Sequence, residues 1–325
     1  MTLSSVRDYL ESRQVAMYFA AVVVAVVASL MVPSLAALDA TINAALAVML
    51  FATFLNVSLG ELGKALTKLR FVAALLFANF VAIPLLVAVL VQVLPPDPLL
   101  RFGVLLVLLT PCIDYVVTFA HLGRADSRSL LAATPLLLAL QILLLPVYLG
   151  LLLADAGHDL IAVEPFVHAF VWLIVVPLAL AGLVQAAAKR NLQASNVAES
   201  LGLLAAPATA LVLFIVVCAV IPRLDAARDS ALKAAPVYIA FALLSPLVGL
   251  VIGYCFRLPA DGLRAVAFSA ATRNSLVVLP LALAVPGAVP VLPAVIVTQT
   301  LVELVSELVY LRLLPKVGAR RANGC

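Results

Sequence analysis

Long apolar runs fill most of the chain, and short polar segments separate them. Ten of these runs reach the roughly 20 residues that a helix needs to cross a bilayer. They lie at about 15–32, 42–60, 70–94, 101–122, 130–153, 165–188, 200–221, 234–257, 262–285 and 290–314. The pattern predicts an all-α polytopic membrane protein with ten transmembrane helices.

The composition agrees with this interpretation, since 66% of the residues are hydrophobic and only 11% are charged. A soluble domain of this length needs more polar residues to cover its surface. No segment between the runs is long enough for a second domain. We therefore expect one transmembrane domain over residues 1–325, with a short cytoplasmic tail at 315–325.

The basic residues predict the orientation of the chain, because cytoplasmic loops carry an excess of Lys and Arg. Of the 20 basic residues, 15 fall on one side of the ten-span arrangement. The opposite loops hold four: Arg101, Arg223, Arg228 and Lys233. We expect a bacterial inner-membrane protein with both termini in the cytoplasm. The net charge of +4 gives no reason to expect a nucleic-acid partner, and the sequence does not indicate an oligomeric state.

Five spans in each half predict two repeats of opposite topology, at about 15–153 and 165–314. A shift of 162 residues supports this division by aligning three pairs: Pro84 with Pro246, Thr110 with Thr272, and Gln141 with Glu303. Inverted repeats with paired interrupted helices are typical of secondary transporters, whose sites lie where those helices break.

The fourth and ninth spans each contain a predicted break. In the fourth span, Pro111 removes a backbone donor and disfavours helix at Thr110. The ninth span carries Arg273-Asn274-Ser275 near its middle, with Pro280 further along. Unwound backbone at this depth is tolerated only inside protein or beside a wet cavity. We therefore expect the two broken helices to cross, with their half-helix ends facing one site.

Two charged residues lie at these breaks, Asp114 in the fourth span and Arg273 in the ninth. An aspartate at the bilayer centre costs roughly 2.5–3.5 kcal/mol on insertion scales. A crossing would allow the two residues to pair. The pair is either a buried structural ion pair or part of the transport pathway, since intramembrane ionisable residues usually mark such pathways.

The tenth span carries a polar stripe in which Gln299, Glu303 and Glu307 recur at every fourth residue. Glu303 is near the middle of the span, so we expect it to be functional. Glu307 is closer to the cytoplasmic end, and we interpret it as an interfacial carboxylate paired with Arg312.

Of the four cysteines, Cys112 alone follows a predicted helix break, where a thiol can act as a soft ligand. Cys218 and Cys255 are interpreted as small hydrophobic residues and Cys325 as part of the tail. The chain lacks the G-x-S-x-G, H-E-x-x-H and Walker patterns. We therefore expect no enzyme activity, no cofactor and no bound metal, and an ion gradient as the energy source.

These motifs resemble those of the yeast-type arsenite efflux permeases, within the bile acid/sodium symporter superfamily. Thr110-Pro111-Cys112 resembles the Ala-Pro-Cys motif of their fourth span, and Ala271-Thr272-Arg273-Asn274-Ser275 their ninth-span break. Leu301-Val302-Glu303 resembles their tenth-span glutamate motif. The resemblance implies ten spans, inverted repeats and crossed broken helices at spans 4 and 9.

The resemblance also implies roles for single residues. Cys112 matches the cysteine needed for arsenite transport, and Glu303 matches the carboxylate tied to substrate or proton. Arsenous acid is neutral at physiological pH, so a soft sulfur and oxygen acceptors suit it. The bile-acid branch carries an E-x-x-x-Q-N pattern that helps to bind sodium, and here Ser269 and Arg273 replace its first two ligands. Sodium coupling by that route is therefore expected to be lost, with Arg273 as a fixed cation.

The sequence leads to one hypothesis and two rivals. The hypothesis is export of arsenite, and of antimonite, in exchange for protons. Thr110, Cys112, Asn274 and Ser275 then bind substrate, and Glu303, Asp114 and Arg273 couple to protons. The first rival is an ion-coupled symporter for an organic anion that uses Arg273 to bind a carboxylate. The second is a sensor or scaffold on the same fold that transports nothing.

Overall fold

The computed structural model of the chain describes residues 3–56, 68–113, 115–153, 168, 171–285 and 287–317. All regular structure within these ranges is helical. Seven helices there are long and apolar enough to cross a membrane: 13–31, 37–56, 69–93, 127–153, 192–220, 227–255 and 291–316. The prediction of an α-helical, multi-pass membrane protein is confirmed.

The remaining three predicted spans take other forms. The fourth consists of two short helices, α6 (Pro98–Leu108) and α7 (Tyr115–Leu122). The ninth consists of α15 (Ala260–Ala271) and α16 (Ser275–Leu283). The sixth lies partly outside the described residues, and its described part is a π-helical segment at Val171–Val175 followed by α11 (Val176–Ala188).

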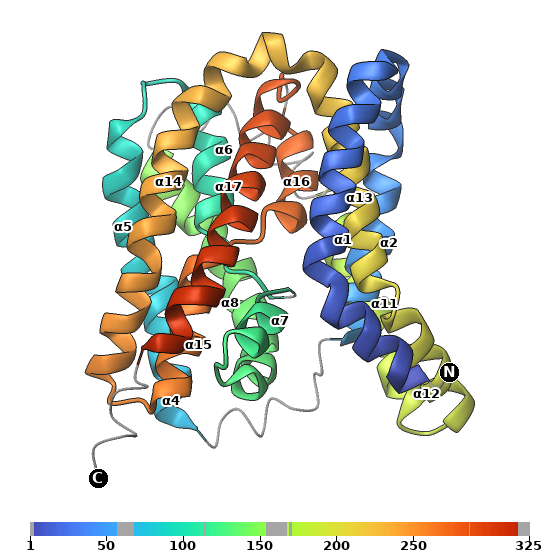
Figure 1. Cartoon of the computed structure of the whole chain (residues 1–325), viewed down its shortest axis with the longest axis vertical. Coiled ribbons are helices and arrows are strands. Elements are labelled where there is room, and N and C mark those ends of the chain that lie inside the picture. Colours follow the sequence, from blue (N-terminus) through green and yellow to red (C-terminus); the bar gives the residue numbers. More distant parts are fainter. Residues whose placement is uncertain are drawn as a thin grey trace. The chain divides into compact units, whose positions relative to one another are not determined.

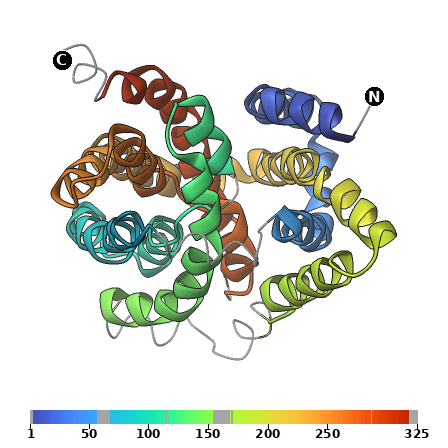
Figure 2. The same cartoon turned by 90° about the horizontal axis from the view of Figure 1, so that it is seen from below.

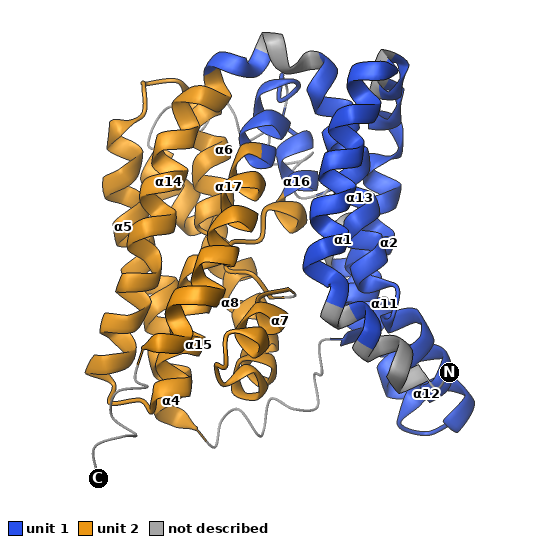
Figure 3. Cartoon of the chain, viewed as in Figure 1, with its two compact units in different colours: residues 1–57, 161–229, 279–297 blue, residues 58–160, 230–278, 298–325 orange. Residues whose placement is uncertain are grey.

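The chain divides into two compact units, and each is assembled from segments of both predicted repeats (Figures 1–3). Unit 1 comprises residues 1–57, 161–229 and 279–297. Unit 2 comprises residues 58–160, 230–278 and 298–325.

Unit 1 is a helical bundle that contains α1 (Leu3–Met31), α2 (Ile42–Asn56), α11, α12 (Leu192–Gly202) and α13 (Ala205–Val220). Helix α1 lies along α13, and α2 packs against both α11 and α13 (Figure 1). Polar side chains tie the helices to one another through backbone carbonyls. The amide of Gln185 donates to the carbonyl of Phe54 at 3.0 Å, and that of Asn56 donates to the carbonyl of Gly202 at 2.9 Å.

Unit 2 contains both helix breaks, with α6, α7, α15 and the start of α16, whereas residues 279–283 of α16 belong to unit 1. The other helices of unit 2 are α4 (Leu69–Phe77), α5 (Ile83–Leu90) and α8 (Ser127–Leu153), with most of α14 (Leu224–Cys255) and of α17 (Val291–Leu313). A π-helical turn, Ala78–Ala82, joins α4 to α5. Helices α4 and α15 lie side by side (Figures 1 and 2), which places this turn near the end of α15.

Four basic segments of unit 2 gather at one end, as the distribution of Lys and Arg predicts. The Lys68 ammonium lies 2.8 Å from the Asp126 carboxylate. The amide of Asp126 donates to the carbonyl of Asp261, and Arg264 donates to the carbonyls of Pro315 and Val317. The predicted loops at 68–70, 124–128 and 257–264 and the start of the tail therefore share one end.

Asp126 lies in a loop outside the transmembrane spans and helps to stabilise the basic end of unit 2. Burial opposes ionisation of its carboxyl group, but hydrogen bonds from Lys68 and Ser129, together with the Lys68 charge, outweigh burial and lower its pKa. The Lys68 side chain is exposed and that of Asp126 is partly buried, so the ion pair contributes at most about 1 kcal/mol to the free energy of unfolding.

Helices α14 and α15 meet at Gly249 with no room for a side chain. A Cβ atom there lies 2.6 Å from Cα of Ala267 and 2.9 Å from the carbonyl oxygen of Val266. Both neighbours are backbone atoms, so a substitution must push the two helices apart.

We predict that Gly249→Ala lowers the thermal stability of the detergent-purified protein, since overpacking typically costs about 1–3 kcal/mol. Gly150→Ala is the matched control, because a Cβ atom at this helical glycine in α8 meets nothing within 4 Å. Melting temperatures measured side by side test this. Equal melting of the two variants would mean that the close contact does not contribute to stability.

Candidate functional site

The unwound segments at the two breaks, both in unit 2, cross and pair with each other. An antiparallel bridge joins Pro111 to Arg273. On one side of it, the amide of Cys112 donates to the carbonyl of Thr272 at 3.1 Å; on the other, the amide of Asn274 donates to the carbonyl of Thr110 at 2.9 Å. These bonds satisfy backbone groups that the ends of helices leave without partners. The predicted breaks and their crossing are therefore both present.

Glu303 of α17 holds this crossing together. Its Oε2 accepts from the backbone amide of Arg273 at 2.7 Å and from the Gln299 side chain at 2.5 Å. Its Oε1 accepts from the Tyr115 hydroxyl, which also lies 3.0 Å from the carbonyl of Arg273. One buried carboxylate thus links α17 to both broken helices.

The Arg273 side chain is fully buried and turns back along α15. Its Nη2 donates to the carbonyls of Ser269 and Ala270 at 2.6 and 2.8 Å, and its Nη1 donates to the carbonyl of Leu108 at 3.4 Å. The same Nη2 donates to Oδ1 of Asn79 at 2.9 Å, and the guanidinium carbon lies 5.5 Å from the centroid of the Phe241 ring. The guanidinium therefore has neutral oxygens around its two terminal nitrogens at the C-terminal end of α15, where a positive charge is favoured. Its Nε has no hydrogen-bond partner among the described residues.

Asn79 and Tyr115 are components of the site that the sequence analysis missed. Asn79 lies in the π-helical turn, donates to Ser269 Oγ at 2.9 Å, and accepts from Arg273. An amide in the interior of the apolar run at 70–94 was the available signal, since the other amide of that run, Gln92, lies near its end. Tyr115 begins the helix after the first break, so its position beside Pro111 and Cys112 was the corresponding signal.

The four predicted substrate residues all lie at the crossing and are fully buried. The Thr110 hydroxyl donates to the carbonyl of Val107 at 2.8 Å, and the Ser275 hydroxyl lies 2.8 Å from that of Thr300. Within the described residues, neither the nitrogen nor the oxygen of the Asn274 amide has a hydrogen-bond partner. Cys112 lies beside the bridge, and its amide is part of the pairing. Asp114, the predicted partner of Arg273, lies outside the described residues.

The expectation that Glu307 is an interfacial carboxylate paired with Arg312 is wrong. Glu307 is fully buried, whereas Arg312 is exposed. The carboxyl Oε1 of Glu307 lies 2.5 Å from the Thr272 hydroxyl, at the second break. Two carboxyl groups one helical turn apart therefore face the crossing.

A small hollow adjoins Glu303 on the side of α14. Its volume is about 10 Å³, roughly the space that one water molecule requires, and its lining includes Tyr238, Gln299, Glu303 and Tyr310. The Tyr238 hydroxyl and the Gln299 Oε1 have no hydrogen-bond partner in the described part of the chain.

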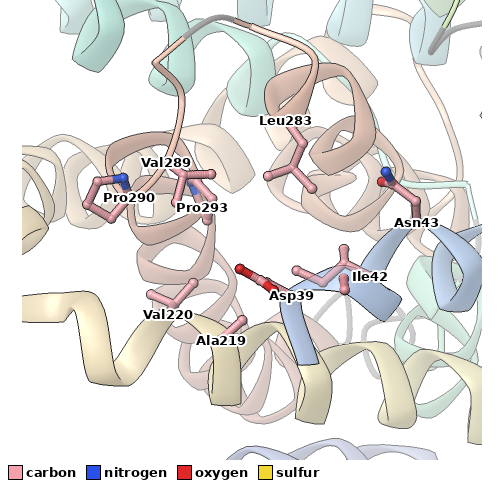
Figure 4. Close-up of a pocket in the computed structure, with 10 residues that line it drawn as sticks. Asp39, Ile42, Asn43, Ala219, Val220, Leu283, Val289, Pro290 and Pro293 are labelled. Atoms are coloured by element: carbon pink, nitrogen blue, oxygen red, sulfur yellow. The ribbon is translucent and has the colours of Figure 1, made fainter. Parts of the chain in front are cut away.

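Unit 1 has a larger cavity of about 230 Å³ (Figure 4). The Asp39 carboxylate is directed toward the side formed by Val220 and Pro293, and Asn43 lies beyond Ile42. Apolar side chains make up most of the remaining lining. None of the predicted substrate residues lines this cavity.

Crossed, interrupted helices with buried polar groups in a multi-pass helical protein define a transporter-like membrane protein. Residues 43–226 match the model of the Sodium Bile acid symporter family, which is more than half of the chain. The chain therefore belongs to this family, whose members are transporters and not enzymes. A search of curated proteins finds no match to the chain.

We predict that Tyr115→Phe destabilises the protein by about 1.5–3 kcal/mol, the usual range for a hydrogen bond to a charged group. Tyr238→Phe is the matched control, because it removes a buried tyrosine hydroxyl that has no partner among the described residues. Chemical or thermal unfolding in detergent measures both. A loss as large in Tyr238→Phe would contradict the assignment of the stabilising bond to Tyr115.

Proposed function

We propose that the chain is a secondary active transporter with ten transmembrane helices in two inverted repeats. The crossing of α6–α7 with α15–α16 supports this proposal, because such crossings form the substrate sites of inverted-repeat transporters. The basic end of unit 2 supports an orientation with that end in the cytoplasm of a bacterial inner membrane, and the distribution of Lys and Arg along the sequence supports the same side for both termini.

The observation that carries the proposal is the Asn274 amide. The Asn274 amide has no partner among the described residues, and a ligand that completes its hydrogen bonds would remove the free-energy cost of burying it. Asn274 offers one donor group and one acceptor at the crossing. A small solute that carries hydroxyl groups satisfies both.

We propose arsenite, with antimonite as an alternative cargo, exported in exchange for protons. Arsenous acid is small, neutral and rich in hydroxyl groups, which suits the amide of Asn274 and the hydroxyls of Thr110 and Ser275. Cys112 supplies the soft sulfur that arsenic prefers. A neutral cargo also needs no cationic ligand, which agrees with a guanidinium whose Nη2 already has three protein oxygens as partners.

The surroundings of Arg273 weigh against the organic-anion alternative. Its Nη2 has three oxygen partners within 2.9 Å, and all of them belong to the protein. An external carboxylate has to displace these partners to bind Nη2, and only Nε is without a hydrogen-bond partner among the described residues. We propose instead that Arg273 acts as a fixed cation that makes transport independent of sodium.

We predict that energised everted vesicles from cells without arsenite exporters accumulate arsenite in a protonophore-sensitive manner. Cys112→Ser and Asn274→Ala abolish this accumulation, because each removes a proposed cargo contact. Cys218→Ser is the control, since Cys218 is equally buried but lies in α13. Accumulation that survives Cys112→Ser in well-expressed protein would remove the thiol from the mechanism.

We also predict that the same flux is unchanged when sodium is replaced by potassium, and that Arg273→Gln abolishes it. A glutamine carries no charge and cannot bond all four oxygens that Arg273 contacts. Paired vesicle assays with sodium and potassium salts measure this. A flux that rises with sodium in the unmodified protein would refute the fixed-cation assignment.

A further inference from the structure

The two buried carboxyl groups of α17 have different surroundings. Glu303 receives hydrogen bonds from three donors: the Tyr115 hydroxyl, the Arg273 amide and the Gln299 side chain. Among the described residues, the Thr272 hydroxyl is the one hydrogen-bond partner of Glu307, and the Glu307 Oε2 has none. Hydrogen-bond donors stabilise an ionised carboxylate, whereas a buried charge without donors is costly. The geometry therefore favours an ionised Glu303 and a neutral Glu307.

The Thr272 hydroxyl can bond to Glu307 in either protonation state. Its oxygen lies 2.7 Å from the carbonyl oxygen of Phe268 and 2.5 Å from Oε1 of Glu307. A threonine hydroxyl has one proton and can also accept. When Glu307 is protonated, it can donate to Thr272 while Thr272 donates to Phe268; when Glu307 is ionised, Thr272 can donate to Glu307.

We propose that Glu307 is the site at which the transported proton binds and leaves, and that Glu303 stays ionised as the anchor of the crossing. This inference rests on the proton coupling of the proposed function and assigns its site. When the Glu307 O–H bond breaks, the proton leaves to water and the carboxylate becomes an acceptor. The Thr272 hydroxyl then turns from the carbonyl of Phe268 to Glu307, and the amide of Thr272 still donates to that carbonyl.

Thr272 connects this proton to the substrate site. Its hydroxyl contacts Glu307, and its carbonyl accepts from the amide of Cys112 at 3.1 Å. Loss of the proton therefore changes the hydrogen bonding of a residue that is itself part of the crossing. The protonation state of Glu307 can therefore affect the broken helices through Thr272, without direct contact between Glu307 and the cargo.

The charged and titratable groups around Glu307 favour a state in which one of the two carboxyl groups, Glu303 or Glu307, is protonated. In the described residues, Glu303 and Tyr310 interact with it from its own helix, and Thr272 contacts it from the second break. The Arg273 charge acts on Glu303. A negative charge on Glu303 one turn away disfavours a second negative charge, so Glu307 is the group that keeps the proton.

Infrared spectroscopy of the purified protein near neutral pH tests the proton directly and needs no substrate. A protonated carboxyl group gives a C=O stretching band, whereas the ionised carboxylates of the surface do not. We expect Glu307→Gln to remove this band and Glu303→Gln to leave it. A band that survives Glu307→Gln, or that disappears in Glu303→Gln alone, overturns the assignment.

Thr272 provides a test that does not depend on how Glu303→Gln folds. Thr272→Val keeps the shape but removes the hydroxyl that accepts from Glu307, so the band shifts and the pH profile of flux moves. Thr272→Ser retains a hydroxyl and should restore both. A purely structural threonine would lower stability in Thr272→Val and leave the band and the pH profile in place, which contradicts the proposal.

Flux assays in proteoliposomes then separate this inference from the proposed cargo. With arsenite as the probe, Glu307→Gln should keep exchange of internal for external arsenite but lose accumulation driven by a pH gradient. Its amide still donates to Thr272 and so imitates the protonated acid. Arsenite accumulation driven by a pH gradient that persists in Glu307→Gln overturns the inference. If the unmodified protein moves no arsenite while the infrared result holds, the cargo proposal fails and the proton site stands.

Discussion

The structure of unit 2 depends on one constraint: backbone groups inside a membrane protein need hydrogen-bond partners. Two helices are interrupted inside the protein, and each interruption leaves amides and carbonyls without partners in their own helix. The Pro111–Arg273 bridge pairs these groups with each other. Each break therefore stabilises the other, and neither half of the crossing is expected to persist alone.

Side chains complete what the bridge begins. Glu303 accepts the amide of Arg273, and the Arg273 guanidinium covers the last carbonyls of α15. Tyr115 spans the carboxylate of α17 and the carbonyl at the second break. Polar residues that are far apart in an apolar sequence thus contact one another at the crossing. The free-energy cost of burying each polar group is offset by the hydrogen bonds between them.

The sequence predicted the breaks well because their signals are local. Pro111 cannot continue a helix, and Arg273-Asn274-Ser275 interrupts an apolar run. It predicted the partners of Arg273 less completely, since the oxygens at Leu108 and Asn79 come from distant segments. The position of Glu307 was misjudged because depth was inferred from distance along the span. Glu307 is buried because the second break packs against α17. The sequence of the tenth span alone cannot predict this contact.

The neutral oxygens around the terminal nitrogens of Arg273 have a consequence for the cell. A free cation occupies its site only as far as its concentration outside permits, so a carrier that needs one depends on its habitat. A cation attached to the backbone is present at every turnover and has no dissociation constant. On the proposed mechanism, the carrier then works equally in fresh water and in brine, and the gradients of protons and cargo set the direction of transport.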